Sequence, residues 1–317
     1  MTLELALPTR PDGRALRRDT IDVFDGGSTA VQRALRRGGL AGYEPDTIAA
    51  ALATFELSEP GFTFYDIGTN IGLYPLLCTS LFEPAHVISF EPTPTTASIA
   101  RKLARLNDAP ICVEEKGVGL TDGSAVLHLS AKSDSSNSFV EGFKPTTGAV
   151  EVAVTTLDSY VAISGKRPDV MKIDAEGFED QVLLGGQRTL ESCRPTIIVE
   201  VLHHDGHDHG PAIEAAIEHL GYSSYPITPY SEWTSPEPIR ASSEEGSRDW
   251  LLSPDPLDAA RFLQRFEAWQ RSLAPCTADR NSRTPSARLG LPAHSAPQTL
   301  GRRLLRRVRA RFPASTA

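Results

Sequence analysis

Short apolar runs alternate with longer amphipathic segments along most of this chain. Runs such as Val87–Phe90 have the length of buried strands, whereas segments such as Pro45–Phe55, with apolar residues at helical spacing, are typical of helices. The pattern predicts strands at Thr20–Phe24, Phe62–Ile67, His86–Phe90, Ile111–Glu114 with its exit at Val118–Leu120, Ala125–Leu129, Val150–Thr155, Asp169–Ile173, Thr196–Val201, Tyr222–Pro226 and Trp250–Leu252. It predicts helices at Pro45–Phe55, Gly72–Phe82, Thr95–Leu106, Leu157–Ala162, Glu179–Leu190, Pro211–Leu220 and Leu257–Ser272.

The alternation of strands with helices predicts an α/β domain whose parallel sheet is covered by helices on both faces. The strands at Tyr222–Pro226 and Trp250–Leu252 are separated by loop sequence without a helix, so we expect an antiparallel pair at one edge. Lys132–Gly148 is rich in Ser, Gly and Asn and has no period. We therefore expect this segment to form a loop or lid.

A glycine loop follows the first strand of this α/β pattern. The strand ends in Asp66 and opens into Gly68-Thr-Asn-Ile-Gly72, and the next strand ends in Glu91, 25 residues after Asp66. Such glycines let the backbone approach a nucleotide cofactor, and the second acid can accept hydrogen bonds from ribose hydroxyls. An aspartate at the loop entrance would repel a pyrophosphate, whereas it suits the positive sulfonium and amino groups of S-adenosylmethionine. The loop therefore predicts S-adenosylmethionine as the cofactor.

Carboxylates also follow a later predicted strand, Asp169–Ile173. Asp174 comes directly after it and Glu176 lies in the following loop, at the edge where ligands bind in open parallel sheets. Lys172 lies within the strand on the same side as Asp174, and a buried lysine needs a carboxylate partner. These residues are candidates for catalysis; the alternative is a structural ion pair with acids at a helix N-terminus.

The strand Thr196–Val201 carries a third group of candidates. Glu200 lies near its end, and His203 follows, where an imidazole could act as a general base near neutral pH. The run from His203 to His209 alternates His and Asp and could also bind a metal. Charged residues in a turn between strand and helix are, however, commonly just solvated. We assign no metal ligand and take Asp174, Glu176, Glu200 and His203 as the catalytic candidates.

Composition restricts the class of protein. The 317 residues are 40% hydrophobic and 23% charged, which is ordinary for a soluble globular protein. We find no apolar run long enough for a membrane helix and no basic and apolar leader at the N-terminus, so we expect a cytoplasmic protein. The cysteines at 78, 112, 193 and 276 are scattered, so we expect reduced thiols.

Charge is distributed unevenly. From Pro275 onward there are nine arginines and one acid, a net charge of +8, whereas residues 1–274 carry a net charge of -16. We expect Cys276–Gln298 to be disordered and Gly301–Phe312 to form a basic amphipathic helix. Such a tail could contact an anionic membrane or an acidic partner weakly, or serve only as a solubilising segment. Nucleic acid is not expected, because Phe312 is the tail's single aromatic residue.

With these residues in place, the chain resembles the FkbM family of S-adenosylmethionine-dependent methyltransferases over roughly residues 42–254. The resemblance rests on the motifs Gly42–Pro45, Tyr65–Tyr74, Phe90–Pro92, Thr156–Asp158, Met171–Glu179, Leu184–Gly186 and Ile197–Glu200. The Lys172-Ile-Asp-Ala-Glu-Gly177 stretch is the most distinctive of them. Thr69 stands where alanine is common and Ala175 where valine is usual, and neither change removes a polar group that the chemistry needs.

The resemblance implies a class I methyltransferase fold, which is Rossmann-like and doubly wound, with seven strands of which the last is antiparallel. It implies that the cofactor is held by residues of these motifs: Glu44, Asp66, Gly68, Thr69, Asn70, Gly72 and Glu91. It also implies methyl transfer, usually to a hydroxyl of a sugar, polyketide or other secondary metabolite, so we expect a small-molecule or glycan acceptor. N-methylation of an amine, a non-catalytic module that binds the cofactor, and a nicotinamide-dependent reductase stay open as alternatives.

The resemblance also suggests a division of the chain. We expect an N-terminal extension at residues 1–41, the methyltransferase domain at 42–256, and a C-terminal helix and tail at 257–317.

Overall fold

The computed structural model describes residues 2–24, 29–204, 207–241, 248–280 and 282–284. Residues Met1–Thr284 form one compact unit. Its α-helices are α1 (Ala30–Gly38), α2 (Pro45–Leu57), α3 (Leu73–Leu81), α4 (Pro94–Leu106), α5 (Leu157–Ser164), α6 (Glu179–Leu184), α7 (Gln187–Cys193), α8 (Gly210–Ile217) and α9 (Ala259–Leu273), with short 3-10 helices η1 (Leu40–Gly42), η2 (Asp134–Ser136), η3 (Glu218–Leu220) and η4 (Ala278–Arg280).

A seven-stranded sheet organises this unit, in the order β13-β14-β10-β9-β3-β4-β5. Its strands are β3 (Thr63–Ile67), β4 (His86–Phe90), β5 (Ile111–Glu114), β9 (Val170–Ile173), β10 (Thr196–Glu200), β13 (Ser223–Pro226) and β14 (Asp249–Ser253). Neighbours pair in parallel except at β14, which is antiparallel to both β10 and β13. The predicted α/β class, with seven strands and an antiparallel last strand, is confirmed.

Strand order reverses at the centre of the sheet. From β3 the chain continues outward through β4 and β5, and then returns to place β9 on the other side of β3. In such sheets ligands bind beyond the carboxyl ends of the strands at this switch point. The residues that follow β3 and β9 are therefore candidates for a ligand-binding site.

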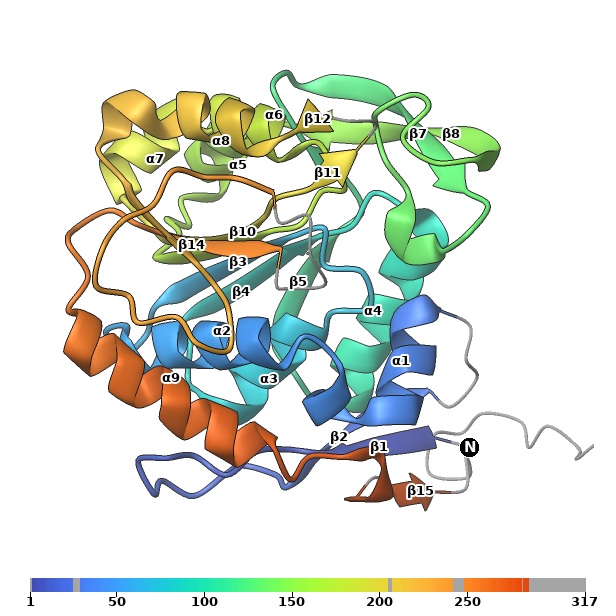
Figure 1. The fold of residues 1–317 in the computed structure, drawn as a ribbon. Helices are drawn as coiled ribbons and strands as arrows, with labels where there is room; N and C mark the ends of the chain where they lie inside the picture. Colours follow the sequence, from blue (N-terminus) through green and yellow to red (C-terminus); the bar gives the residue numbers. More distant parts are fainter. Residues whose placement is uncertain (1, 25–28, 205–206, 242–247, 281, 285–317) are drawn as a thin grey trace, which may run out of the picture. The chain divides into compact units, whose positions relative to one another are not determined.

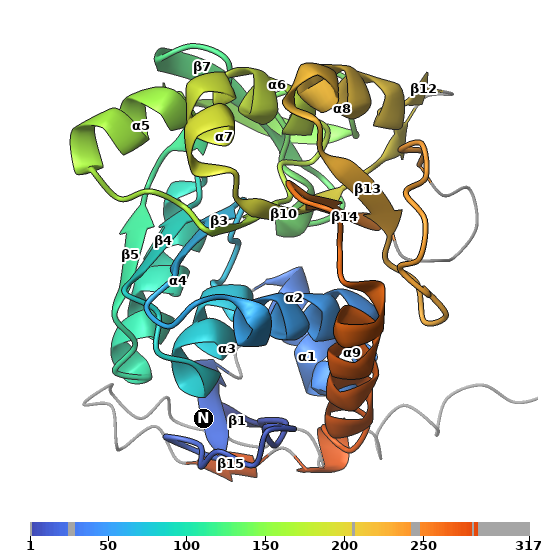
Figure 2. The same ribbon diagram turned by 90° about the vertical axis from the view of Figure 1, so that its left-hand side faces the viewer.

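Helices cover both faces of the sheet, in two layers (Figures 1 and 2). Helices α2, α3, α4 and α9 lie on one face, and α5, α6, α7 and α8 lie on the other. Side chains alternate accordingly along β3, because Phe64 belongs to the first core while Tyr65 and Ile67 belong to the second. Among the described residues, every helix is too short or too polar to span a lipid bilayer.

A second, three-stranded sheet stands beside the main one, formed by β6 (Gly117–Val118), β8 (Thr146–Thr155) and β7 (Gly123–Ser130). Strand β7 covers the predicted strand Ala125–Leu129 and pairs antiparallel with β8. The predicted exit of the third strand at Val118–Leu120 differs in the structure, where Gly117 and Val118 form β6 and pair in parallel with β8.

The prediction of one helix over Glu179–Leu190 is also wrong. The chain forms α6 and α7 and breaks at Gly185-Gly186. A Cβ on Gly185 would overlap the carbonyl group of Gly119, so only glycine permits this close approach. Asp158 then accepts hydrogen bonds from the backbone N–H groups of Arg188 and Thr189 at the start of α7.

The two ends of this unit pack together. Strand β1 (Thr2–Ala6) pairs with β2 (Thr20–Phe24) and with β15 (Ser282–Thr284), and α9 packs against α2 with Phe262, Phe266 and Trp269 buried. The expected disorder of Cys276–Gln298 is therefore wrong for residues 276–280 and 282–284, because β1 offers β15 an edge to pair with. The rest of that segment and the predicted helix at Gly301–Phe312 lie outside the described residues, and the proposed division into domains stays a prediction.

All four cysteines are free thiols, as expected.

Candidate functional site

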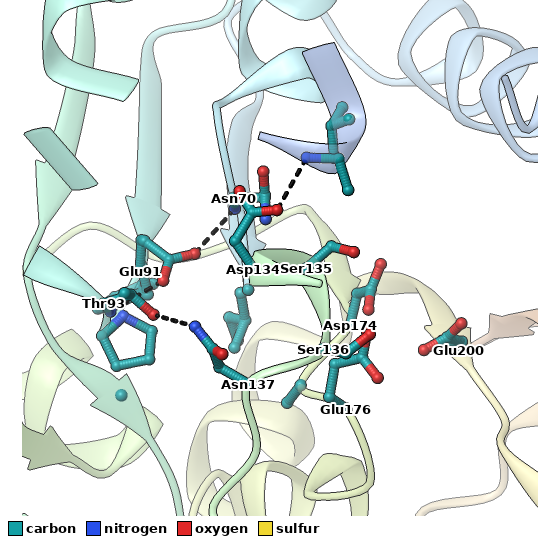
Figure 3. Close-up of a pocket in the computed structure, with 18 of the residues that line it drawn as sticks. Asn70, Glu91, Thr93, Asp134, Ser135, Ser136, Asn137, Asp174, Glu176 and Glu200 are labelled. Carbon is teal, nitrogen blue, oxygen red and sulfur yellow. Dashed lines mark hydrogen bonds between the residues drawn. The ribbon is translucent and has the colours of Figure 1, made fainter. Parts of the chain in front are cut away.

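A cavity of about 360 Å³ lies at the carboxyl ends of the central strands. Figure 3 shows Asn70, Glu91 and Thr93 at one end of it, and Asp174, Glu176 and Glu200 at the other. Its lining residues come from α1 and the start of α2, from the loops after β3, β4, β9 and β10, from the segment between β7 and β8, and from the residue before β14. The candidates from the sequence that line it are Glu44, Gly68, Asn70, Glu91, Asp174, Glu176 and Glu200.

The glycine loop is shaped by residues behind this cavity. Asp66 is buried and accepts a hydrogen bond from the Thr69 hydroxyl at 2.5 Å, and burial raises the pKa of Asp66 to about 6. Gly68, Asn70 and Gly72 have φ of 81°, 51° and 83°, the left-handed region that favours glycine and asparagine. Asp66, Thr69 and Gly72 therefore shape the loop, while Gly68 and Asn70 face the cavity.

Glu91 directly follows β4, beside this loop. Its Oε2 accepts a hydrogen bond from the backbone N–H of Asn70 at 3.0 Å, and its Oε1 accepts one from the backbone N–H of Thr93 at 2.8 Å. Burial raises the pKa of Glu91 to about 7. A carboxylate has about four acceptor positions, so Glu91 keeps acceptor capacity for ribose hydroxyls.

Glu44 lies at the N-terminus of α2 with φ 45° and ψ 48°, a costly conformation for a residue other than glycine. The Tyr74 hydroxyl donates a hydrogen bond to Glu44 Oε2 at 3.0 Å, and burial raises the pKa of Glu44 to about 7. Lys172 lies beneath it, 4% exposed, with Nζ 2.7 Å from Asp174 Oδ2 and 4.8 Å from the centre of the Tyr74 ring. The partner that the sequence predicted for this buried lysine is Asp174.

Asp174, Glu176 and Glu200 converge at the far end of the cavity. One carboxylate oxygen of each lies within 4.8 Å of the other two, a spacing that one divalent cation could bridge. Each acid also has a cation of its own. Lys172 pairs with Asp174 at 2.7 Å, Lys144 with Glu176 at 3.2 Å, and Arg248 with Glu200 at 3.7 Å.

Burial changes the acidity of this group. It raises the pKa of Glu176 to about 7, with the charge of Asp174 adding to the effect, and it raises the pKa of Glu200 well above its ordinary range. Oε2 of Glu200 is enclosed and has no hydrogen-bond partner within the described part of the chain. Glu179 holds the loop in place from behind, because its Oε1 accepts hydrogen bonds from the backbone N–H groups of Ala175 and Gly177.

A glycine loop, a ribose-side acid and a group of carboxylates thus share one cavity at the switch point of the sheet. The sequence of residues 66–224, half of the chain, matches the Methyltransferase FkbM domain. The chain belongs to the FkbM methyltransferase family. The resemblance inferred from the sequence is confirmed.

The chain is similar to two named methyltransferases. Hexuronic acid methyltransferase AglP of Haloferax volcanii is 30% identical over 160 residues, which cover 50% of this chain and 62% of that protein. Methyltransferase sdnD of Sordaria araneosa is 28% identical over 189 residues, covering 50% of this chain and 72% of that protein. The solved structure of Methyltransferase FkbM from Methylobacillus flagellatus KT has a TM-score of 0.41 and 14% identity, covering 62% of this chain and 44% of that one. The chain thus spans less than two thirds of the length of AglP.

His203 lies apart from the carboxylates of Asp174, Glu176 and Glu200. It is exposed in β11 (His203–His204), which pairs with β12 (His207–Asp208), and it does not line the cavity. Residues 205 and 206 of the histidine-rich turn lie outside the described residues. The structure therefore brings three of the four catalytic candidates together and leaves His203 outside.

The segment expected to form a loop or lid lies along the cavity. Asp134 Oδ1 accepts a hydrogen bond from the backbone N–H of Ala30 in α1 at 2.8 Å, and Asn137 Nδ2 donates one to Thr93 Oγ1 at 3.2 Å. The Ser138 hydroxyl donates to the carbonyl oxygen of Glu176 at 2.7 Å. We call the stretch from Ser133 to Lys144 the cover segment.

Several lining residues were not among the candidates. Helix α1 contributes Ala30, Val31, Ala34 and Arg37, although it precedes the family domain. Arg248 lies directly before β14. An antiparallel strand begins at the edge where its parallel neighbours end, so the predicted antiparallel strand could have pointed to Arg248 and Asp249.

Proposed function

We propose that this protein is an S-adenosylmethionine-dependent O-methyltransferase that acts on a hydroxyl group of a sugar or another secondary metabolite. The observation that carries the proposal is the shared cavity. The glycine loop and Glu91 form one end of it, and Asp174, Glu176 and Glu200 form the other. A cofactor at the first end would present its methyl group to an acceptor at the second.

The residues present fit this cofactor. Glu91 has free acceptor capacity for the ribose hydroxyls, and the left-handed loop at Gly68 and Asn70 lets the ligand approach the backbone. Glu44 and Asp174 line the cavity with carboxylates that suit the positive sulfonium and ammonium groups. When bound, S-adenosylmethionine supplies the methyl group on a sulfonium that is already a good leaving group.

The protein's own task is then to align the acceptor and to take its proton. We assign the role of general base to Glu176. It lines the cavity, and its pKa of about 7 lets it be ionised and still basic near neutral pH. Lys144, 3.2 Å away, favours the ionised form. His203 is outside the cavity and is not part of this proposal.

The class of acceptor is inferred from a named relative and from the charges at the acceptor end of the cavity. AglP is named for a hexuronic acid, which supports a sugar as the acceptor of this chain. The cations that pair with Asp174, Glu176 and Glu200 also favour a neutral hydroxyl over a positively charged amine, because they already neutralise those acids.

The test is transfer of labelled methyl from S-adenosylmethionine to a panel of sugars, uronic acids and amines. We expect a methylated hydroxyl product and, in Glu176→Gln, a loss of kcat of about 10²- to 10⁴-fold, the usual contribution of a general base. Binding of the cofactor to Glu176→Gln should be retained, and Glu141→Gln, an exposed acid of the cover segment, serves as the control. Transfer only to amines, or no binding of the cofactor, would contradict the proposal.

A further inference from the structure

Among the described residues, the basic side chains that line the cavity differ in whether they have an acid as a partner. They are Arg37, Lys116, Lys144 and Arg248. Lys144 and Arg248 pair with acids at the end of the cavity proposed for the acceptor, and Lys116 lies 4.0 Å from Glu114. Arg37 is exposed and forms no ion pair with the residues that the structure describes. An unpaired guanidinium at a cavity wall can bind an anionic group of a ligand.

The position of Arg37 on α1 turns it toward the cavity. Ala30, Ala34 and Arg37 all line the cavity, and their spacing of four and then three residues places them on one face of the helix. The chain continues from this last turn of α1 through η1 to Tyr43 and Glu44, which line the cavity as well. The stretch from residue 30 to residue 44 therefore contributes one continuous part of the wall.

Contacts at both ends of α1 join it to distant parts of the compact unit. At its start, the backbone N–H of Ala30 donates a hydrogen bond to Asp134 of the cover segment. Beyond its end, Gly39 has φ 65°, and a Cβ there would overlap the carbonyl oxygen of Cys276. The backbone N–H of Ala41 donates to the same carbonyl oxygen at 3.1 Å. Such close backbone packing limits the movement of the helix end that carries the cation.

The proposed cofactor has an anionic group that the acids of the cavity cannot bind. Its methionine part carries an α-ammonium and an α-carboxylate on the same carbon atom. Glu44 and Asp174 suit the ammonium group, but they would repel the carboxylate. Arg37 lies seven residues before Glu44 in the same part of the wall. This short stretch of chain thus offers a cation and an anion for the two charges of the amino-acid group.

The order of strands argues against Lys116 as the partner of that carboxylate. Lys116 follows β5, which lies beyond β4 at one edge of the sheet, whereas β9 lies on the other side of β3. If Glu91 after β4 binds the ribose, the methionine part must extend away from β5, because the methyl group has to reach the acceptor beyond β9. Lys116 would then lie at the adenine end of the cofactor.

We propose that Arg37 binds the α-carboxylate of S-adenosylmethionine, so that α1, which precedes the residues of the family domain, completes the cofactor site. This inference rests on the proposed function. A planar guanidinium presents two parallel N–H groups to a carboxylate, and this geometry orients the ligand as well as binding it. The ammonium group on the same carbon is then directed toward the acids of the wall.

Two ligands that differ in this one group test the assignment. Decarboxylated S-adenosylmethionine keeps the sulfonium, the amine and the adenosine but lacks the α-carboxylate. Titration calorimetry on the full chain measures the Kd of each ligand. We expect Arg37→Gln to weaken S-adenosylmethionine by about 10- to 100-fold, the usual contribution of a charge-assisted pair, and to change the decarboxylated ligand by less than about twofold.

Neighbouring and conservative substitutions serve as controls. Arg36→Gln removes the same charge from the same turn of α1, at an exposed side chain that is not among the described residues lining the cavity. It should leave both Kd values unchanged. Arg37→Lys keeps the charge but loses the paired N–H groups, so we expect a loss of affinity for S-adenosylmethionine between those of wild type and Arg37→Gln. Because the Arg37 side chain is exposed, these variants should fold, and thermal unfolding checks this.

An equal loss of affinity for both ligands in Arg37→Gln would overturn the inference, since it would show a structural role of the side chain. Unchanged affinity for S-adenosylmethionine would also overturn it. If that variant instead raised the KM of uronic acids but not of neutral sugars, the arginine would serve a carboxylate of the acceptor. These results would leave the proposed function intact, whereas absence of S-adenosylmethionine binding to the wild-type protein would refute both.

Discussion

Gly68 and Gly72 offer a matched pair of substitutions in the candidate cofactor loop. Both have left-handed backbone, with φ of 81° and 83°, so alanine at either position carries the same conformational cost of about 1–2 kcal/mol. Their surroundings differ. A Cβ on Gly72 would lie 3.8 Å from Ala100 Cβ, an ordinary contact, whereas a Cβ on Gly68 would overlap the Asp174 carbonyl oxygen and lie 2.7 Å from its carbonyl carbon.

This contact decides the size of the effect at Gly68. The Asp174 carbonyl oxygen, the atom nearest the added Cβ, would have to retreat by more than the roughly 0.7 Å that the carbonyl carbon needs to reach an ordinary contact distance. That movement would strain the hydrogen bond from the backbone N–H of Asp174 to the carbonyl oxygen of Ile67, now 2.9 Å long. Overpacking costs about 1–3 kcal/mol and the hydrogen bond about 1 kcal/mol. We therefore expect Gly68→Ala to be less stable than Gly72→Ala by about 2 kcal/mol.

Urea unfolding of the two variants measures this difference, and calorimetry measures S-adenosylmethionine binding. Gly68→Ala should also lose at least about tenfold in affinity, because its loop and Asp174 move apart at the cavity wall. Gly72 does not line the cavity, so Gly72→Ala should bind almost normally. Equal stabilities of the two variants would refute the argument from close approach and leave backbone strain as the sole cost.

Further expectations follow from the buried acids, the paired carboxylates and the basic tail. Burial raises the pKa of Glu179 to about 8. Between about pH 4.5 and pH 8 the folded state therefore keeps a proton on this side chain that the unfolded state has lost. The free energy of unfolding falls as pH rises through this range. Glu179→Gln should flatten this dependence in urea titrations at several pH values, and an unchanged slope would contradict the raised pKa. Methyl transfer should continue in the presence of EDTA, because Asp174, Glu176 and Glu200 are each paired with a cationic side chain. A loss of activity that Mg²⁺ restores would instead identify these three residues as a metal site. Deletion of residues 285–317, which removes seven arginines and no acid but spares β15, should release the protein from anionic liposomes in sedimentation if the tail binds membranes. Equal sedimentation of both forms would exclude that role.

The sequence located the acids that end parallel strands because their position follows from topology alone. Asp66, Glu91, Asp174 and Glu200 each stand at or next to a strand end, and such ends meet at one edge of the sheet. The same reasoning from topology does not hold for His203, which lies three residues past Glu200 with its side chain exposed in β11. Topology places residues at a strand end but not those that lie several positions beyond it.

Other features depend on contacts that no local pattern encodes. The pairing of β15 with β1 joins Thr284 to Thr2 from opposite ends of the compact unit, and β15, with the sequence Ser-Arg-Thr, carries no hydrophobic signal. A hydrogen bond from the backbone N–H of Ala30 to Asp134 joins α1 to the cover segment, 104 residues further along the chain. The sequence Gly185-Gly186 marks the break between α6 and α7, but the helical periodicity on both sides of it predicted one continuous helix.

The two ends of the cavity differ in how their acids are balanced, and this difference bears on the chemistry. At the acceptor end, Glu176 and Glu200 each have a cation, from Lys144 in the cover segment and from Arg248 before β14. At the cofactor end, Glu44, Asp66 and Asp249 share the field of Lys172, which is already paired with Asp174. The acids at the acceptor end are therefore each balanced by a cation, which suits a neutral acceptor. Lys144 belongs to the cover segment, so displacement of that segment would remove the cation that favours the ionised form of Glu176. The proposed base is therefore best able to accept a proton when the cavity is covered.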